Sequence, residues 1–306
     1  MTVAIKQKPE IAVNLINGIL SIKPLANFAR HQARQMIIKR AERIGVPWRQ
    51  ASQALLSRDW SEELHHIENP DIEYPEYYFR EFHAYEAGNM SWEAAAEAEV
   101  AARSVHASLW PDMSLEGDIR LRQSYHQALG EQLPQAPRDI VDFGCSIGLS
   151  TCALQDRYPD AQITGVELSP YFLAVAYYRA QQENRAITWV HNPCEHTGLP
   201  DAAYDLVSIC LVCHELPQSA TQEIFREARR LLRPQGHLAI MDMNPQSEVY
   251  VKMPSYVFTL LKSTEPYLDQ YFALDIEGAL IGAGFHKPSI TRNTPRHRTI
   301  VAPVAD

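Results

Sequence analysis

The chain carries the sequence DIVDFGCSIGLS at residues 139–150. Its apolar first half, which ends at Phe143, is typical of a short strand buried on both faces. Gly144 and Gly148 follow and allow a sharp turn in which the backbone can approach a ligand without an intervening Cβ. A helix that begins after Gly148 would present free N–H groups to a polar or negatively charged ligand. This stretch therefore predicts a buried strand, a glycine turn and a helix in succession.

A second predicted strand, residues 161–168, brings a carboxylate to the same edge of the sheet. Glu167 stands near its end, 25 residues after Asp142. In a doubly wound sheet, an acid at the tip of the second strand can accept hydrogen bonds from the two hydroxyls of a ribose. The turn lacks the G-x-G-x-x-G spacing of nicotinamide-binding domains. A nucleoside site is therefore favoured, and a nicotinamide oxidoreductase is the weaker alternative.

Four segments, in this order along the chain, resemble class I S-adenosylmethionine-dependent methyltransferases. Residues 141–148 and 165–169 are similar to the nucleoside-binding signature of that family. Residues 204–209 resemble its fourth strand, and residues 227–240 resemble its next helix, turn and fifth strand. The resemblance covers residues 136–302, and the whole chain is also similar to plant and cyanobacterial methyltransferase-like proteins. It implies an α/β fold with a doubly wound, Rossmann-like, seven-stranded sheet and a final antiparallel strand.

The same resemblance implies S-adenosylmethionine as the cofactor and S-adenosylhomocysteine as its product. Asp142 would act on the cofactor amine or hold the turn, Glu167 would bind the ribose diol, and Leu211 would lie near the transferred methyl group. The predicted cofactor-binding residues are Asp142, Gly144, Cys145, Ser146, Gly148, Glu167, Leu168, Asn192, Cys194, Glu195 and Leu211.

The expected contact to adenine departs from the family. Many members have an acid after the third strand whose carboxylate accepts the adenine amino group. Here Pro193 falls on or near that position and cannot act in this way. Asn192 and Glu195 are the predicted substitutes.

Methyl transfer from a sulfonium needs an aligned nucleophile, exclusion of water and, for some acceptors, removal of a proton. His214, just beyond the fourth predicted strand, is the candidate base because imidazole titrates near neutrality. A structural histidine bonded to the backbone is the alternative. Glu215 would orient His214 or bind a substrate cation, and Asp242 is a further candidate at the end of the fifth strand. The other candidate substrate residues, which include aromatic residues equally suited to packing, are His83, Tyr85, Trp92 and Arg296.

The run Cys210-Leu-Val-Cys213-His214 matches the C-x-x-C-H pattern of haem attachment and half of a zinc site. Strand geometry would send Cys210 and Cys213 to opposite faces, and no second Cys/His pair is present. No metal is therefore predicted. Five cysteines in no disulfide-like spacing, and no apolar run of about 18 residues, favour a cytoplasmic protein.

The predicted organisation has two parts. Residues 1–135 form a mostly helical cap or substrate region, in which Ser91 caps a helix. Residues 136–306 form the cofactor-binding domain, and an insertion near 244–275 is placed to act as a lid. Strands are expected at 138–143, 161–167, 187–191, 205–212 and 237–242, and a final hairpin at 285–290 and 297–302.

Charge is unevenly distributed along the N-terminal part. Residues 1–50 hold nine Lys and Arg against two acids, and residues 51–100 hold two against twelve acids. A basic amphipathic helix within residues 10–45 could contact a membrane surface. The favoured interpretation is that it covers the rest of the protein and pairs with the acidic segment. The net charge of −9 argues against nucleic-acid binding.

The predicted function is methyl transfer to a small organic acceptor, for which the aromatic-rich cap and insertion suggest an aromatic, quinone-like or natural-product molecule. The alternative from another class is a non-catalytic, cofactor-binding scaffold or assembly factor at a membrane. The acceptor atom, whether oxygen, nitrogen or carbon, stays open, and so does the oligomeric state.

Overall fold

The computed structural model describes residues 23–83 and 85–305. A seven-stranded sheet with the order β3-β2-β1-β4-β5-β7-β6 forms its centre. The strands are β1 (Asp139–Phe143), β2 (Gln162–Glu167), β3 (Ile187–His191), β4 (Tyr204–Cys210), β5 (Leu232–Met243), β6 (Ser289–Arg292) and β7 (His297–Pro303). Strands β1 to β5 are parallel, and β7 is antiparallel to β5 and β6. The predicted doubly wound α/β fold with an antiparallel strand near its end is confirmed.

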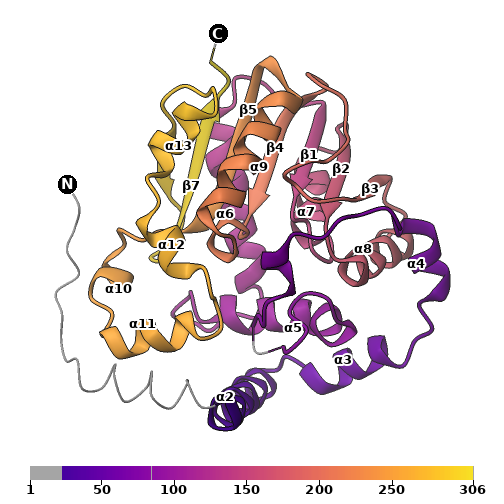
Figure 1. Cartoon of the computed structure of the whole chain (residues 1–306), viewed down its shortest axis with the longest axis vertical. Coiled ribbons are helices and arrows are strands. Elements are labelled where there is room, and N and C mark those ends of the chain that lie inside the picture. Colours follow the sequence, from indigo (N-terminus) through magenta and orange to yellow (C-terminus); the bar gives the residue numbers. More distant parts are fainter. Residues whose placement is uncertain (1–22, 84, 306) are drawn as a thin grey trace.

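Helices cover both faces of this sheet (Figure 1). One face packs against α6 (Gly117–Gln132) and α7 (Leu149–Arg157), and the other packs against α9 (Gln218–Leu231) and α13 (Ile276–Gly282). Helix α8 (Pro170–Gln182) follows β2 and contacts β2 and β3. Helix α6 precedes residue 136, but it packs on the sheet of the cofactor-binding domain. The division of the chain into two parts at residue 135 therefore stays a prediction.

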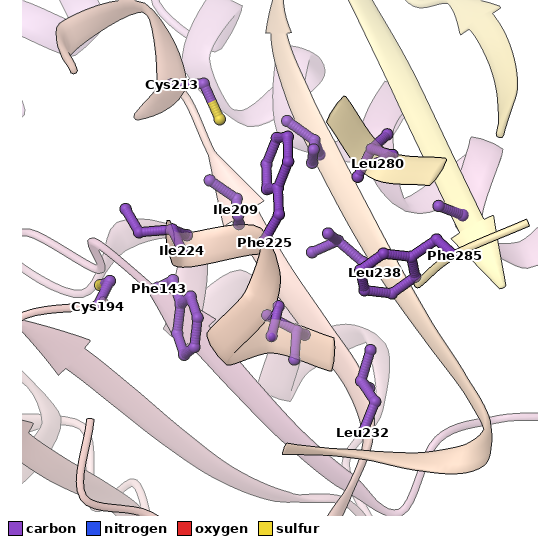
Figure 2. Packing of buried hydrophobic residues seen from close by; sticks show 14 of the residues in the cluster. Phe143, Cys194, Ile209, Cys213, Ile224, Phe225, Leu232, Leu238, Leu280 and Phe285 are labelled. Atoms are coloured by element: carbon purple, nitrogen blue, oxygen red, sulfur yellow. The ribbon is translucent and has the colours of Figure 1, made fainter. Parts of the chain in front are cut away.

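The larger core lies between the sheet and α9. Phe225 and Ile224 of α9 are buried and pack with Ile209 of β4 and Leu238 of β5 (Figure 2). The buried positions of α9 recur every three or four residues, which is the period that places them on one helical face. Arginines occupy positions between them, so the other face of α9 remains in water.

The two cysteines of the C-x-x-C-H run lie in different cores, although Cys213 follows the end of β4 in the 3₁₀ turn η2 (Cys213–Glu215) and is not on the strand as expected. Cys210 packs under α6 and α7, whereas Cys213 packs under α9. Across the described residues, no group of three or more His, Cys, Asp or Glu side chains is arranged to hold a metal ion.

Three predicted strand boundaries are wrong. The fifth strand begins at Leu232 rather than residue 237, because Leu232 pairs with Tyr204 ahead of a register shift in the ladder. The other two boundaries have local reasons. The strand expected at 285–290 begins only at Ser289, because Pro288 has no N–H to donate to a ladder. Phe285 is instead a buried core residue with a single bridge to Val304. The fourth strand ends at Cys210 rather than residue 212, because Leu211 adopts a left-handed φ of 61°.

The N-terminal part is mostly helical, as expected. It contains α2 (Lys23–Arg43), α3 (Trp48–Leu56), α4 (Ser61–Ile67), the 3₁₀ turn η1 (Glu76–Phe79) and α5 (Trp92–Ala107). The predicted N-cap of α5 is confirmed, since the Ser91 side chain accepts a hydrogen bond from the Ala94 N–H.

Residues 10–22 of the predicted basic helix lie outside the described residues, but α2 supports the favoured interpretation of the remainder. Ile38 and Ala41 are buried in a cluster with Val100 of α5. Arg34 pairs with Glu97 of α5 at 2.6 Å, so a base of this helix does meet the acidic segment. In the part of the chain that the structure describes, no helix has the length and apolar character needed to cross a bilayer.

Candidate cofactor and acceptor site

The turn after β1 has the left-handed backbone that its glycines allow. Gly144 and Gly148 have φ values of +63° and +81°, and Ser146 between them also has a positive φ. A Cβ added to Gly144 would lie 2.7 Å from Val212, and one added to Gly148 would lie 2.8 Å from Trp189. The Cβ positions of these two glycines are therefore filled by side chains of the protein itself, and at both positions the turn can offer a ligand only backbone polar groups.

Glu167, at the end of β2, joins this turn to the start of α8. Its buried carboxylate accepts hydrogen bonds from the backbone N–H groups of Ser146 (2.8 Å), Leu168 (2.9 Å) and Ser169 (2.8 Å). It also accepts one from the Tyr78 hydroxyl at 3.1 Å. Burial raises the pKa of Glu167, although these hydrogen bonds oppose the shift. Its carboxylate stands at the sheet edge where a ribose was expected.

Asp142, on β1, is fully buried and only half satisfied. One carboxylate oxygen, Oδ2, accepts hydrogen bonds from the hydroxyls of Ser150 (2.6 Å) and Thr151 (2.8 Å). The other, Oδ1, is buried without a hydrogen-bond partner among the described residues. A buried acceptor without a partner is costly, and it suits a ligand that brings a donor.

A segment of the N-terminal part, residues 69–83, crosses the carboxyl ends of β2 and β3, and we call it the strap. In Figure 1 its path from α4 leads to the middle of the molecule. Asn69 donates from its backbone N–H to His191 Nδ1 (3.0 Å) and from its side chain to Asn192 Oδ1 (3.1 Å). The Tyr77 hydroxyl donates to Glu195 Oε1 at 2.5 Å. The strap thus contacts both predicted adenine substitutes.

The remaining predicted cofactor residues lie at the same edge of the sheet. Cys145, Leu168 and Cys194 are buried, and burial raises the pKa of both thiols. Leu211 follows β4, and its backbone N–H donates to the Met241 carbonyl at 2.8 Å. The ends of β1 to β4 therefore hold all the residues assigned to the cofactor from the sequence.

His214 forms a buried pair with Asp242 of β5. His214 Nδ1 lies 2.7 Å from Asp242 Oδ1, and the backbone N–H of His214 donates to Asp242 Oδ2 at 3.2 Å. Burial disfavours the charged imidazolium, but the Asp242 carboxylate outweighs it and raises the pKa of His214 to about 10. The ring is therefore protonated at neutral pH, which differs from the near-neutral titration expected of an isolated histidine.

The strap and the insertion meet beside His214. The insertion contains α10 (Glu248–Val251), α11 (Ser255–Lys262) and α12 (Leu268–Ala273). His83 Nε2 lies 2.6 Å from Glu265 Oε1 and 4.0 Å from Glu215 Oε1, and the His83 N–H donates to the Thr264 carbonyl at 3.0 Å. Burial raises the pKa of Glu215 to about 7, although His83 and His214 oppose the shift. Two of the predicted substrate residues, His83 and Glu215, are thus brought to His214.

The other three predicted substrate residues, Tyr85, Trp92 and Arg296, make contacts with other parts of the protein. The Tyr85 hydroxyl donates to Glu97 Oε2 at 2.6 Å, and Trp92 stacks on Trp60 with ring centroids 5.2 Å apart. Trp92 also meets Tyr171 of α8 edge-on, with ring centroids 4.9 Å apart, so it packs between the N-terminal part and α8. The Arg296 carbonyl accepts a hydrogen bond from the Asn244 N–H at 2.7 Å, at the start of the insertion.

Tyr77, Tyr78 and Glu265 were given no role from the sequence. The aromatic cluster at residues 74–79 was a visible signal, but nothing in it says which strands it crosses. Glu265 lies in the insertion, and its second oxygen, Oε2, is buried without a partner in the described part of the chain. Only the fold brings these side chains to the ends of β2 to β5.

Comparison with known proteins agrees with this architecture. Residues 141–240 match a methyltransferase domain family. The chain is 26% identical over 133 residues to demethylmenaquinone methyltransferase of Thermus thermophilus, which covers 44% of this chain and 58% of that protein. It is 26% identical over 228 residues to N-demethylindolmycin N-methyltransferase of Streptomyces griseus, which covers 68% and 92%. Two malonyl-[acyl-carrier protein] O-methyltransferases are covered for only 35% and 51% of their lengths.

A solved structure shares the fold. The geranyl diphosphate C-methyltransferase of Streptomyces coelicolor has a TM-score of 0.50 and 16% identity, over 62% of this chain and 80% of that protein. With the strand order and the glycine turn, these matches identify a class I S-adenosylmethionine-dependent methyltransferase domain, and S-adenosylmethionine is the cofactor of that class.

The His214–Asp242 pair predicts a specific pH dependence of stability. Because the folded protein raises the pKa of His214 from 6.5 to about 10, the pair stabilises the fold fully below pH 6.5 and loses this contribution as the pH rises through 10. We expect His214→Gln to lower the free energy of unfolding at pH 6.5 and to have a progressively smaller effect toward pH 9.5, as measured by urea denaturation. The exposed His286→Gln serves as the control, and a constant His214→Gln effect across this range would contradict the raised pKa.

Proposed function

We propose that this chain transfers the methyl group of S-adenosylmethionine to a small organic acceptor. The observation that carries the proposal is the convergence of the glycine turn, Glu167 and the His214–Asp242 pair at one edge of a class I sheet. Ligands of open α/β sheets bind at this carboxyl edge. Two relatives are named for the small acceptors demethylmenaquinone and N-demethylindolmycin, which supports an acceptor of similar size.

The cofactor would supply an electrophilic methyl group on a sulfonium. Glu167 would hold its ribose hydroxyls, and the unpartnered Oδ1 of Asp142 would accept a hydrogen bond from its amine. Asn192 or Glu195 would contact the adenine amino group, since both lie at the end of β3 with acceptor oxygens. The backbone polar groups of the turn at Gly144–Gly148 would face the methionine part.

His214 would align the acceptor at the end of β4. Asp242 fixes the ring through Nδ1, which leaves Nε2 as the position for an acceptor atom. With the ring protonated, Nε2–H would donate to an anionic oxygen such as a phenolate, enolate or carboxylate. A neutral acceptor would instead require the deprotonated ring as general base, and its rate would rise toward high pH.

The insertion and the strap would enclose the acceptor. Tyr77 of the strap faces Tyr267 of the insertion edge-on, with ring centroids 6.3 Å apart. Within the insertion, the rings of Tyr250 and Phe258 both contact Phe272, with centroid distances of 5.2 Å and 5.1 Å. These rings favour an aromatic or quinone-like acceptor, and the insertion would act as its lid.

The cofactor assignment predicts the outcome of a calorimetric titration. The purified chain should bind S-adenosylmethionine and S-adenosylhomocysteine, but not NAD.

Glu167→Gln should weaken the binding of both cofactor forms by about 1–3 kcal/mol, because the amide has one acceptor oxygen and no charge.

Glu248→Gln is the matched control, since Glu248 lies exposed on α10 and pairs with Lys252. The unfolding midpoint of Glu167→Gln should be compared with that of the wild type, because Glu167 also holds the turn. NAD binding alone would favour the oxidoreductase alternative, and an unchanged affinity in a folded Glu167→Gln would remove Glu167 from the ribose contact.

The role of His214 predicts a split between turnover and cofactor affinity. Once an acceptor is found, His214→Gln should lower kcat by about 10²–10⁴-fold if the ring moves a proton, and should change cofactor affinity little. The dependence of kcat on pH would show whether the protonated or the deprotonated His214 ring is the active form. Full activity in this variant would make His214 a structural residue that stabilises the end of β4.

A peripheral membrane contact is a second candidate, and α2 carries the observation that favours it. Met36 is 65% exposed and Ile37 is 43% exposed. Lys39, Arg40 and Arg43 are exposed on the same helix. Apolar side chains beside bases are the combination that binds an anionic lipid surface.

Flotation tests this second candidate. The wild type should float with vesicles that contain phosphatidylserine and not with phosphatidylcholine alone, and Met36→Glu combined with Ile37→Glu should remain at the bottom of the gradient. Ile119→Glu is the matched control because Ile119 is equally apolar and 56% exposed on α6. If the double variant floats like the wild type, α2 is not a membrane contact.

A further inference from the structure

We propose that the strap, residues 69–83, occupies the ribose end of the cofactor pocket in the free protein and leaves it when the nucleoside binds. In this arrangement the Tyr78 hydroxyl takes the position of a ribose hydroxyl on Glu167. The inference rests on the proposed function, because it concerns the entry of the same cofactor.

The strap contacts the very side chains that would bind the nucleoside. Its donors reach Glu167 from Tyr78, Asn192 from Asn69 and Glu195 from Tyr77. These three acceptors lie at the ends of β2 and β3, where the cofactor is expected. A nucleoside that binds through the same oxygen atoms would therefore replace hydrogen bonds that the strap makes now.

The hydrogen bonds of Glu167 show which of its partners can be exchanged. An ionised carboxylate has about four acceptor positions, and four donors reach Glu167. Three of these donors are backbone N–H groups at the turn and at the start of α8, which belong to the fold itself. The Tyr78 hydroxyl comes from the strap. Exchange of this hydroxyl for a ribose hydroxyl keeps the number of hydrogen bonds constant.

The strap is attached lightly enough to move. No residue of its 3₁₀ turn η1 is fully buried, and Phe79 is 59% exposed. Tyr77 packs against the edge of the larger core and Phe82 is buried, but the other contacts of the strap with β2 and β3 are hydrogen bonds and aromatic edges. Segments that bury little apolar surface open at low free-energy cost.

The C-terminal end of the strap links this movement to the acceptor side. His83 has a left-handed φ of 48°, which is uncommon for a residue with a Cβ. Its side chain contacts Glu265, and its N–H contacts the Thr264 carbonyl of the insertion. Movement of the strap would therefore release the insertion at the point where it covers His214 and Glu215.

The test compares the affinity for S-adenosylhomocysteine of the wild type, Tyr78→Phe and Tyr158→Phe by calorimetry. Tyr78→Phe removes the competing hydroxyl and keeps the ring, so its Kd should fall by roughly three- to tenfold. Tyr158→Phe is the matched control, because Tyr158 lies after α7, outside the strap, and its hydroxyl has no hydrogen-bond partner in the described part of the chain, so its Kd should stay within about twofold of the wild type.

An equal or weaker affinity in Tyr78→Phe would overturn the inference and make Tyr78 part of a fixed wall of the site. Failure of all three proteins to bind S-adenosylhomocysteine would instead reject the proposed function, so the two failures are distinguishable.

Hydrogen exchange gives a second readout that does not depend on a variant. Saturating S-adenosylhomocysteine should speed exchange of the strap amides, including the Asn69 N–H that now bonds to His191, and should leave α9 unchanged. Slower or unchanged exchange in the strap would contradict its departure from the pocket.

Discussion

The carboxylate of Glu167 is the interaction on which the site depends. It binds the backbone of the turn after β1 and the first residues after β2, so two loops from different strands share one acceptor. A carboxylate that accepts several N–H groups holds them more firmly than a neutral acceptor would. The positions of Ser146, Leu168 and the start of α8 follow from this one side chain, and the strap is attached to it as well. The same group thus holds these loops together and is the proposed ribose contact.

Much of the fold could be predicted from the sequence, because its signals are local. The apolar run before Gly144, the helix formers between the strands and the spacing to Glu167 fixed the central strands to within a few residues. The prediction was wrong at the starts of β5 and β6 and at the end of β4. Pro288, which delays the start of β6, is visible in the sequence as a strand breaker. The left-handed φ of Leu211, which ends β4, leaves no mark on the apolar pattern from which a strand is recognised.

The sequence predicted the place of a site residue only where that residue directly follows a single strand. The residues after β1, β2, β3 and β4 lie together because parallel strands end at the same edge. Pairs between distant segments gave no such signal. His214 and Asp242 are 28 residues apart, and Tyr78 and Glu167 are 89 apart, so no local pattern indicates that they meet. The pKa of His214 depends on such a pair, which is why its raised value differs from the titration near neutrality expected from the sequence.

Trp189 of β3 fills the space that two glycines leave. A Cβ on Gly148 or on Gly165 would each lie within 2.8 Å of its indole ring, although the glycines belong to different segments. The three positions therefore form one steric unit, in which a larger residue at either glycine requires a smaller one at 189. A smaller residue at 189 alone would open a void beneath the turn and loosen its backbone. At Gly148 the φ of +81° adds backbone strain to this steric limit, and the indole is an intrinsic fluorophore at the point where the turn meets the sheet.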